Sequence, residues 1–475
     1  MGLLISKSNF DWVPVHLAKP MKRFFVQDGN ILLNITGAGS IGRVSIYYGN
    51  EQPLTNQHIA RLDIKKAYDS AYICAFLSSW WGERIIEQGI SGSTGQLNLV
   101  NDHIHTLPVL IPDTKVQIYI GDKVWQAGRL SDRSRYWEKR IKILVTSAEI
   151  KKSLDVKKQK WNTPIVKDLE PRLDAKYYNH QAMQVLKICQ VDSQSIRELL
   201  PDASNGFEYR HFVEQGRPYI TVTEVSSERL NIIDAPQIPL SVSIPEKAKV
   251  DRCCVLVIRT GSVGTAIKVH SEDEDASISS HLIRLKFKEE IIAAAVAAFL
   301  NSEAGCCLLH KISYGAVQPQ VGQEEVLSLP IPSFILNCAS DILHCMNLQE
   351  KCIRSAERLT NAAKLLVEAL IEGKISETDL KAAQEGLEKG DTTLDREILA
   401  RLTRKGMDNP NEPPLFPDLD ALYAALASLE ATETTEAANP PQNRVANVYH
   451  LHSTPLALAS EAHDTAYRVS AEVPE

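Results

Sequence analysis

The sequence lacks several features that would place it in common protein classes. It has no run of about 18 uninterrupted apolar residues, so a membrane-spanning helix is not expected. Met1–Phe10 has no basic stretch followed by an apolar one, which argues against a secretory signal peptide. Nine cysteines are scattered without a Cys-x-x-Cys spacing. We therefore expect a cytoplasmic protein with reduced, mostly buried thiols and no metal site.

Signatures of catalysis are also missing. The chain has no Gly-x4-Gly-Lys-Ser/Thr loop, which excludes ATP binding of that kind. Asn439-Pro440-Pro441 is followed by Gln442 rather than by the aromatic residue that stacks on a flipped base in DNA methyltransferases. Pro112-Asp113 has no Glu-x-Lys partner at nuclease spacing. We expect no catalytic residue and no cofactor in this chain.

A strong charge of one sign is absent from most of the chain. The formal net charge is −7, but the stretch from Asp391 onward holds fourteen acidic and six basic residues. That stretch carries −8, so the residues before it together carry +1. A nearly neutral body can still bind DNA when its basic residues share one face, so charge alone does not exclude this function.

What the sequence does contain is an internal repeat. Five short segments recur in the same order at an offset of 222 to 224 residues. The pairs are Ile31–Val44 with Val255–Ala266, His58–Leu62 with His281–Leu285, Ala75–Ser79 with Ala298–Ser302, Gln96–Leu99 with Gln318–Val321, and Leu107–Pro112 with Leu329–Pro332. The first copy carries Ala38 and Gly39 in addition. This order indicates two diverged copies of one domain.

A helical pattern follows each copy. Apolar and small residues recur with alternating spacings of three and four, which keeps one seam on one side of a helix. The seam residues are Leu130, Trp137, Ile141 and Leu144 in the first helix and Leu359, Leu366 and Leu370 in the second. We predict that these seams pack against each other in antiparallel fashion, with one copy at each end, and that Gly373 ends the second helix.

The expected fold class is α+β. Each Gly-rich segment lies between two β-like runs, so each copy reads as strand, turn, strand within a mixed α/β domain. We expect domain one at 1–112, the first long helix at 113–160, domain two at 161–333, the second long helix at 334–375, and a tail at 376–475 that is partly helical and then disordered. The two long helices form an antiparallel coiled coil that separates the domains.

Several of these motifs resemble one known family. The motifs are Gly29-Asn-Ile-Leu-Leu33, Ser40-Ile-Gly-Arg43, Asn56-Gln-His-Ile-Ala-Arg-Leu62, Ser93-Thr-Gly-Gln96 and Arg172-Leu-Asp-Ala-Lys-Tyr-Tyr178. Together they resemble the target recognition domains of the specificity (S) subunit of Type I restriction-modification systems, over about residues 3 to 375. The resemblance implies a binding subunit without catalysis, in which each domain reads one half of a bipartite double-stranded DNA site.

The resemblance also implies partners. Two methylation subunits would dock on the helices and restriction (translocase) subunits would join them. S-adenosylmethionine, ATP and Mg²⁺ would then belong to those partner subunits. The first copy departs from the family pattern because it lacks a leading segment ahead of its first strand, which begins near Leu3. Either the true start lies upstream or the first domain is incomplete.

Candidate DNA-binding residues fall into two groups. The Gly-rich turns could hold phosphate or could be plain tight turns, and their candidates are Ser40, Arg43, Arg259, Thr260 and Ser262. Base-reading residues should differ between copies, which points to segments that do not align. Those candidates are Tyr209, Arg210, His211, Thr223 and Arg229 in the second copy and Lys7 and Asn9 in the first.

Other repeated residues favour structural roles. His58 and His281 recur beside Arg61 and Arg284, but no nucleophile or acid recurs with them. The basic residues from Arg129 to Lys142 on the first helix could face phosphates, partner carboxylates or solvent.

Two alternatives stay open: the recognition half of a differently organised nuclease-methyltransferase system, and a coiled-coil scaffold without DNA contact.

Overall fold

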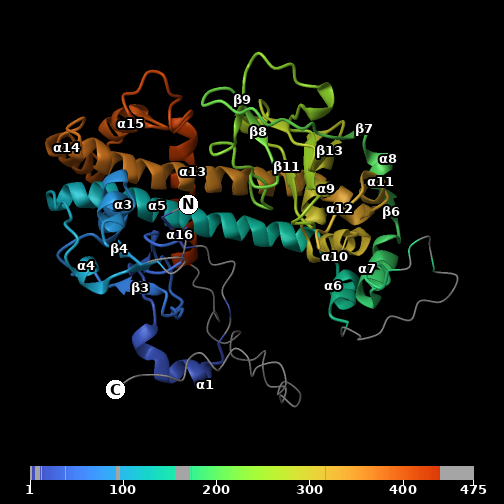
Figure 1. The fold of residues 1–475 in the computed structure, drawn as a ribbon, viewed down its shortest axis with the longest axis horizontal. Coiled ribbons are helices and arrows are strands. Elements are labelled where there is room, and N and C mark those ends of the chain that lie inside the picture. The colour runs from blue at the N-terminus through green and yellow to red at the C-terminus, as the bar shows by residue number, and fades with distance from the viewer. Residues whose placement is uncertain are drawn as a thin grey trace. The chain divides into compact units, whose positions relative to one another are not determined.

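The computed structural model describes residues 3–5, 11, 13–37, 39–92, 97–156, 169, 172, 174–315 and 317–438. Residues 1–425 form one compact unit, and residues 426–475 are grouped as a second. Helices and short sheets mix throughout the first unit, so the expected α+β class is confirmed (Figure 1). Lys7 and Asn9 lie outside the described residues.

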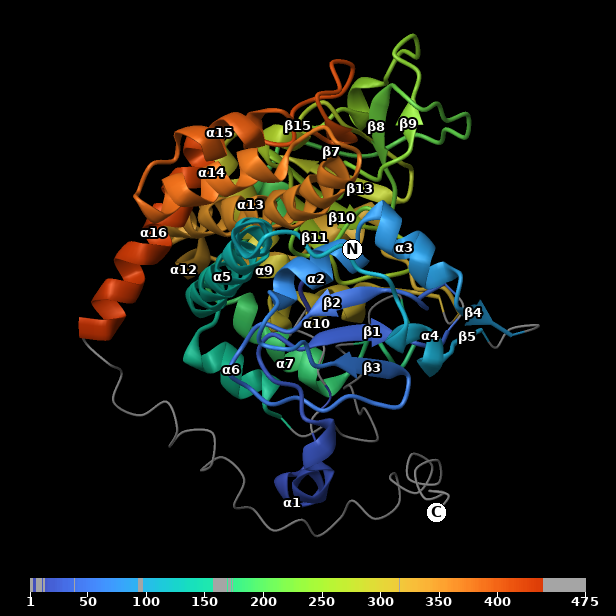
Figure 2. The same ribbon diagram turned by 90° about the vertical axis from the view of Figure 1, so that its left-hand side faces the viewer.

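The first copy is built on a three-stranded antiparallel sheet of order β2-β1-β3. Its elements, in chain order, are α1 (Val15–Ala18), η1 (Lys19–Phe24), β1 (Ile31–Asn34), β2 (Val44–Ile46), β3 (Ile59–Leu62), α2 (Ser70–Leu77), α3 (Trp80–Glu87), β4 (Ile90–Ser91), β5 (Asn98–Leu99) and α4 (Asn101–His105). Helix α2 lies between this sheet and the long helix that follows the copy (Figure 2).

The second copy is larger. Its main sheet has the order β11-β10-β13-β7, and a second sheet has the order β12-β8-β9. Its elements are α7 (His180–Cys189), β6 (Ser193–Ser195), α8 (Ile196–Leu199), β7 (Asp202–Asn205), β8 (Arg217–Ile220), β9 (Gln237–Ile238), η3 (Glu246–Ala248), β10 (Cys254–Ile258), β11 (Ala266–Lys268), η4 (Ser271–Asp273), β12 (Ser277–Ile278), β13 (Leu282–Lys286), α9 (Glu290–Leu300), α10 (Glu303–Ile312), α11 (Gln323–Leu327), β14 (Pro330–Pro332) and α12 (Ser333–Asn337).

The repeated sequence segments form strands that pair with the same register in both copies. Ile31 pairs with Ile46 and Leu62 in the first sheet. Val255, its counterpart, pairs with Lys268 and Leu285 in the second. The hydrogen bond from Ile35 N to His58 O recurs from Arg259 N to His281 O, at 2.9 Å in both copies. The two copies therefore share one strand order and one register around β1 and β10.

The corner after the sheet is repeated as well, and it explains the Ala-Phe-Leu-x-Ser sequences. Ser79 Oγ donates to Phe76 O at 2.7 Å and accepts from Gly82 N, which caps α3. Ser302 Oγ makes the same two bonds with Phe299 O and Gly305 N. A Cβ on either glycine would lie about 2 Å from the Phe76 or Phe299 carbonyl oxygen, so only glycine fits the corner.

The two long helices are α5 (Thr114–Leu144) and α13 (Ala339–Ile371), and they pack side by side in antiparallel directions (Figure 1). The direction is fixed by Trp137, late in α5, whose ring lies 6.3 Å from that of His344, early in α13. The helix expected over 113–160 ends at Leu144, after which α6 (Ala148–Leu154) begins, capped by Ser147 Oγ. The helix expected over 334–375 is divided into α12 and α13.

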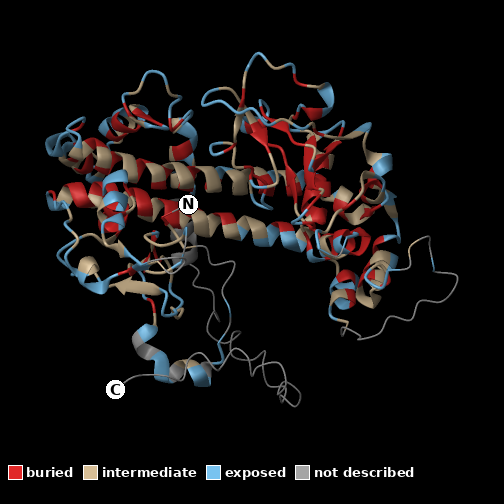
Figure 3. Ribbon diagram, viewed as in Figure 1, coloured by how far each residue is buried: buried red, intermediate tan, exposed pale blue. Residues whose placement is uncertain are grey.

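The copies lie at opposite ends of this helix pair. Helices α2 and α3 of the first copy pack on the last part of α13, and α2 also packs on α5. In the second copy, the core that contains Val257 and Leu308 also holds Ile141, near the end of α5, and Ile342, near the start of α13. Buried residues line the facing sides of the two helices (Figure 3).

Residues 376–425 are more ordered than the expected tail. They form α14 (Glu377–Glu388), α15 (Thr393–Ala400), β15 (Leu402–Thr403), β16 (Gly406–Met407) and the first part of α16 (Leu419–Ala438). Asp395 is buried against α5, where it accepts from Lys123 Nζ and Tyr119 OH, each at 2.6 Å. Burial raises the pKa of Asp395, but the ammonium of Lys123 and its hydrogen-bond donors outweigh this effect and lower it. This ion pair fastens the segment to α5.

Among the described residues, no single helix is long and apolar enough to cross a membrane, and α9 and α10 pass that test only as a pair bent by 77°.

Candidate nucleic-acid interface and helix seam

The first Gly-rich turn packs against its own domain. Asn34 N bonds to Arg43 O and Gly42 N to Asn34 O, which closes the turn between β1 and β2. Ser40 Oγ faces the carbonyls of Thr36 and Gly37 at 3.4 Å, and Gly42 has a positive φ of 83°. A small pocket beside the turn is lined by nine residues: Leu3, Ile41, Gly42, Arg43, Val44, Ser78, Glu83, Glu87 and Lys364. Glu83 and Glu87 line this pocket together with the basic residues Arg43 and Lys364, so its charged lining residues have no excess positive charge to attract a phosphate.

The second Gly-rich turn also serves the fold. Thr260 is only 9 % exposed and forms a β-bridge with Gln320, just as Thr36 does with Asn98. Gly264 has a φ of 109° and approaches the His310 ring of α10 so closely that a Cβ would lie 2.7 Å from it. Burial thus makes Thr260 unsuitable for contacting DNA, whereas Ser262 is exposed and Arg259 half-buried.

The loop between β7 and β8 holds three candidates around an aromatic cluster. Phe207, Tyr209 and Tyr219 pack together, with the Phe207 and Tyr219 rings 5.5 Å apart. Tyr209 also contacts the rings of His211 and Phe212, and Phe212 is 47 % exposed. Arg210 is exposed and pairs with Glu208. The structure therefore brings Tyr209, Arg210 and His211 together on one aromatic-supported loop.

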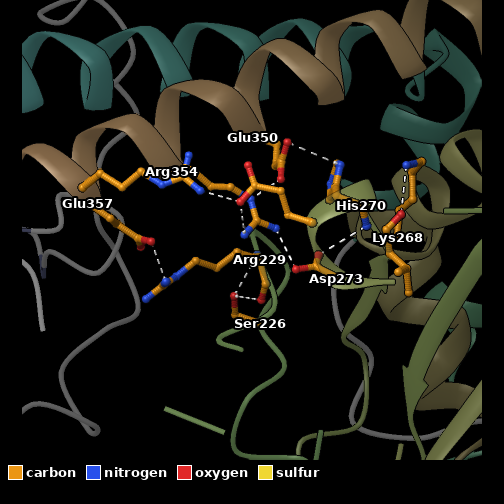
Figure 4. A network of polar contacts seen from close by, with 11 residues as sticks. Ser226, Arg229, Lys268, His270, Asp273, Glu350, Arg354 and Glu357 are labelled. Carbon is orange, nitrogen blue, oxygen red and sulfur yellow. Dashed lines mark hydrogen bonds and ion pairs between the residues drawn. The ribbon is translucent and has the colours of Figure 1, made fainter. Parts of the chain in front are cut away.

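Thr223 and Arg229 lie on the next loop and have different surroundings. Thr223 is exposed, while its neighbour Glu224 is buried and accepts from Thr221 N and Oγ1, which fixes the backbone. Arg229 donates to Glu357 of α13 at 2.7 Å, so its guanidinium joins the loop to the helix (Figure 4). Arg229 is thus placed apart from the other candidates, because its guanidinium is held against α13, whereas the Arg210–Glu208 pair is exposed on its loop.

A polar network continues from Arg229 along the same face of α13 (Figure 4). Arg354 binds Asp273 at 2.8 Å and also Glu350 one helical turn away. Burial raises the pKa of Asp273, and the Arg354 guanidinium opposes that rise. Lys268, buried nearby, donates to Val269 O and pairs with Glu290. These contacts fix the second copy to α13 through charge, and they were not visible in the sequence pattern.

His270 in this network gives a prediction for stability. Burial, helped by the positive charges of Lys268 and Arg354, lowers the pKa of His270 to about 3. An unfolded histidine has a pKa of about 6.5, so below that pH the unfolded state binds a proton that the folded state refuses. The free energy of unfolding should therefore fall by up to ~1.4 kcal/mol per pH unit as the pH drops from about 6.5 towards 3.

The measurement is urea unfolding at a series of pH values. His270→Gln should flatten the pH dependence in this window, whereas His211→Gln, at an exposed position, should leave it unchanged. Parallel curves for the wild type and His270→Gln would contradict the assignment.

The seam residues are divided between two places. Trp137, Ile141 and Leu144 pack with the second copy's core, beside Ile342, Cys345 and Met346 of α13. Leu359 and Leu366 are fully buried in the last part of α13, which antiparallel pairing sets against the first half of α5. Direct packing of the first group against the second was therefore wrong, although the antiparallel direction was right. Leu130 is buried between them, and Leu370 is half-buried and lines a groove together with Trp81 and Leu110.

The first half of the α5 seam was missed. It consists of Val116, Tyr119, Ile120, Val124 and Ala127, all buried. Lys123 lies among them. A lysine is expected at the surface from the sequence, but the ammonium of Lys123 is buried against Asp395. No local signal marked this lysine, because its partner lies 272 residues away.

The recurring arginines and the Arg172 motif have structural roles. Arg61 donates to Phe25 O, and Arg284 donates to Glu246 O and Lys249 O at the matching position of the second copy. Arg172 donates to the Ile312 and Ser313 carbonyls, so the motif that begins at Arg172 caps the end of α10. Among the basic residues of α5, Arg133 lies over the Tyr136 and Trp137 rings and Lys142 pairs with Glu138.

Within the part of the chain that the structure describes, no group of three or more His, Cys, Asp and Glu side chains is placed to hold a metal ion. Burial raises the pKa of the thiols of Cys74, Cys189 and Cys254, in each case to about 12. A buried thiol of this kind is a weak nucleophile.

No protein-family model matches the chain, and no curated protein matches it either. Several solved structures, in contrast, match the chain. An S subunit of a Type I restriction-modification system from M. genitalium is 14% identical, covers 73% of this chain and 84% of its own, and has a TM-score of 0.38. The HsdS subunit from Thermoanaerobacter tengcongensis is 11% identical, with coverages of 78% and 82% and a TM-score of 0.26.

A third structure concerns the assembly and conformational transition of a type I R-M system. It is 10% identical, with coverages of 74% and 83% and a TM-score of 0.27. In its sequence motifs and among solved structures, the chain is similar to the S subunit of Type I restriction-modification systems.

Proposed function

We propose that the chain is a specificity subunit of a Type I restriction-modification enzyme, which directs methylation and restriction partners to a bipartite DNA target. One observation carries the proposal: two copies of one α/β domain are held at opposite ends of an antiparallel helix pair. Such an arrangement suits a ligand with two separated half-sites. A protein that binds one small molecule at a single site has less need of two separated domains.

The length of the helix pair fits duplex DNA. Helices of 31 and 33 residues are about 45–50 Å long at 1.5 Å per residue. Half-sites one turn apart on a duplex are separated by roughly 34–36 Å. The overlapping ends of α5 and α13 therefore hold the two domains at a separation of the same order, and the stiffness of the packed pair keeps it constant.

The copies differ in the regions that do not serve the shared sheet. The second copy inserts β8, β9 and their loops, which have their own core around Tyr219, Ile238 and Ile278. The described residues ahead of β1 in the first copy form α1 and η1 instead. Two different reading surfaces on a common frame predict an asymmetric motif. Tyr209, Arg210, His211 and Thr223 are our candidates for base or phosphate contacts in the second half.

The chemistry would belong to the partners. We assign S-adenosylmethionine to methylation subunits, and ATP and Mg²⁺ to restriction subunits, because the described residues offer binding surfaces and buried thiols. The expectation is that the purified chain shows no methyl transfer, nuclease or ATPase activity. Adding methylation subunits should produce methylation at a bipartite motif, measured by methylome sequencing.

DNA binding by the assembled complex should weaken steeply with salt, as phosphate contacts require. Turnover that follows the purified chain through every column would sink the binding-subunit assignment. A complex that leaves duplex DNA unshifted at low salt would favour a scaffold without DNA contact.

A further inference from the structure

Residues 376–425 cover one face of the helix pair at the first-copy end. Helix α14 packs on α5, where Glu385 pairs with Lys115 at 3.0 Å. Helix α15 brings Asp395 to Lys123 of the same helix at 2.6 Å. Strand β16 packs on α13, so the segment reaches both helices of the pair at this end (Figure 1). The face is therefore occupied by an acidic, mostly helical segment that binds lysines of α5.

The same face continues along the pair to the second-copy end. An α-helix returns to the same side after five turns of 3.6 residues, which is 18 residues. On α5, Trp137 lies five turns after Tyr119, which binds Asp395. On α13, which runs in the opposite direction, His344 lies five turns before the buried Ala362. The Trp137 and His344 rings lie 6.3 Å apart across the pair, so these two residues form the continuation of the covered face.

At the second-copy end this face is cationic and aromatic. The guanidinium carbon of Arg133 lies 4.7 Å from the ring centre of Tyr136 and 4.9 Å from that of Trp137. Arg140 of α5 and Lys351 of α13 are exposed. Among the residues that the structure describes, no carboxylate pairs with Arg133, Arg140 or Lys351. The cations of this end thus lack the acidic partners that the covered end has.

The composition of the open surface suits a protein partner. Tryptophan, tyrosine and arginine are enriched among the interface residues that contribute most to binding. Residues 157–168 of this chain, which follow α6 and lie outside the described residues, carry four lysines and one aspartate. Their charge has the same sign as that of the surface. An acidic helix from a partner is complementary to the surface, whereas this stretch of the chain is not.

We propose that α14 and α15 take, at the first-copy end, the place that an acidic helical segment of a methylation subunit takes at the second-copy end. The chain then binds one methylation subunit on this face, because its own segment already fills the other of the two equivalent places. The identity of the partner rests on the proposed function. The inference differs from the arrangement that the family resemblance implies, in which two methylation subunits dock on the helices.

The first test measures the stoichiometry of the complex. The full chain is mixed with an excess of the purified methylation subunit of the same system, and native mass spectrometry gives the mass of the complex. One methylation subunit per chain is expected. Asp395→Lys places two like charges together beside Lys123, so it should release the segment and admit a second subunit. Two subunits on the unaltered chain would overturn the inference and leave the proposed function intact, whereas no complex at all would overturn both.

A milder variant releases the segment without a buried charge. Glu385→Lys combined with Glu388→Lys removes the ion pairs of α14 with Lys115, which lie at the surface. Hydrogen exchange of the α14 amides reports the release, and circular dichroism shows that the rest of the fold is kept. The released chain should bind two methylation subunits. A released α14 without a second bound subunit would contradict the equivalence of the two places.

Charge reversal locates the open surface. Arg140→Glu should weaken binding of the methylation subunit by about tenfold or more, because it opposes the acidic helix. Lys142→Glu is the matched control, since Lys142 is also exposed but lies on the opposite side of α5. Equal effects of the two changes would overturn the assignment. A loss of duplex DNA binding in Arg140→Glu, with unchanged binding of the methylation subunit, would assign the surface to DNA and overturn it as well.

A photo-cross-linking residue at Lys351, which is exposed on α13, identifies the occupant in the assembled complex. It should capture an acidic helix of the methylation subunit. Capture of a segment of this same chain would overturn the assignment to a partner.

Discussion

Leu366→Asp should lower the free energy of unfolding by about 3–5 kcal/mol, since it leaves an unpaired charge in the interior. Leu366 is 0 % exposed and lies in the part of α13 that packs against the first half of α5. Lys123, a cation buried on the facing helix α5, is already engaged by Asp395. Urea unfolding followed by circular dichroism would measure the loss.

Ile143→Asp is the matched control. Ile143 lies near the end of α5 and is 65 % exposed, so the same change there should alter the free energy of unfolding by about 0.5 kcal/mol or less. Equal effects at the two positions would mean that α5 and α13 do not form the structural axis of the molecule.

Replacing residues 196–330 with those of a relative of different specificity should change one half of the DNA motif and leave the other half intact. The boundaries lie beside the paired strands β6 and β14, so α5, α13 and the first copy stay as they are. Each base pair read contributes roughly 1–3 kcal/mol, so the loss of a half-site would be large. Methylome sequencing of cells that carry the exchanged subunit with its methylation partners is the measurement.

The reciprocal exchange of residues 1–110, which include the candidates Lys7 and Asn9, is the control for this experiment and should change the other half of the motif. An exchange that altered both halves, or neither, would contradict reading by two separate domains. An unaltered motif that became rare would instead indicate that the polar network around Arg354 no longer fixes the second copy to α13.

The repeat could be predicted from the sequence because it consists of short local patterns of residues. The strand-turn-strand segments, the helix caps at Ser79 and Ser302, and the glycines that the tight corners require are each encoded by residues close together in the sequence. Each of these patterns occurs in both copies. The antiparallel helix pair followed from the order of copies and helices. The seam register did not, because Lys123, Gly121 and Gly128 interrupt the apolar pattern of the first half of α5.

The sequence by itself therefore determined the two copies, their strand order and the presence of two long helices. The tertiary structure alone decided how these parts are joined. Asp395 with Lys123, Arg229 with Glu357 and Arg354 with Asp273 link residues 81 to 272 positions apart. A charged residue buried by a distant partner looks like a surface residue in any local window, because its burial depends on a partner that the window does not contain. The groove beside Trp81 became visible for the same reason, since only folding sets α3, residues 108–110 and the end of α13 around one space.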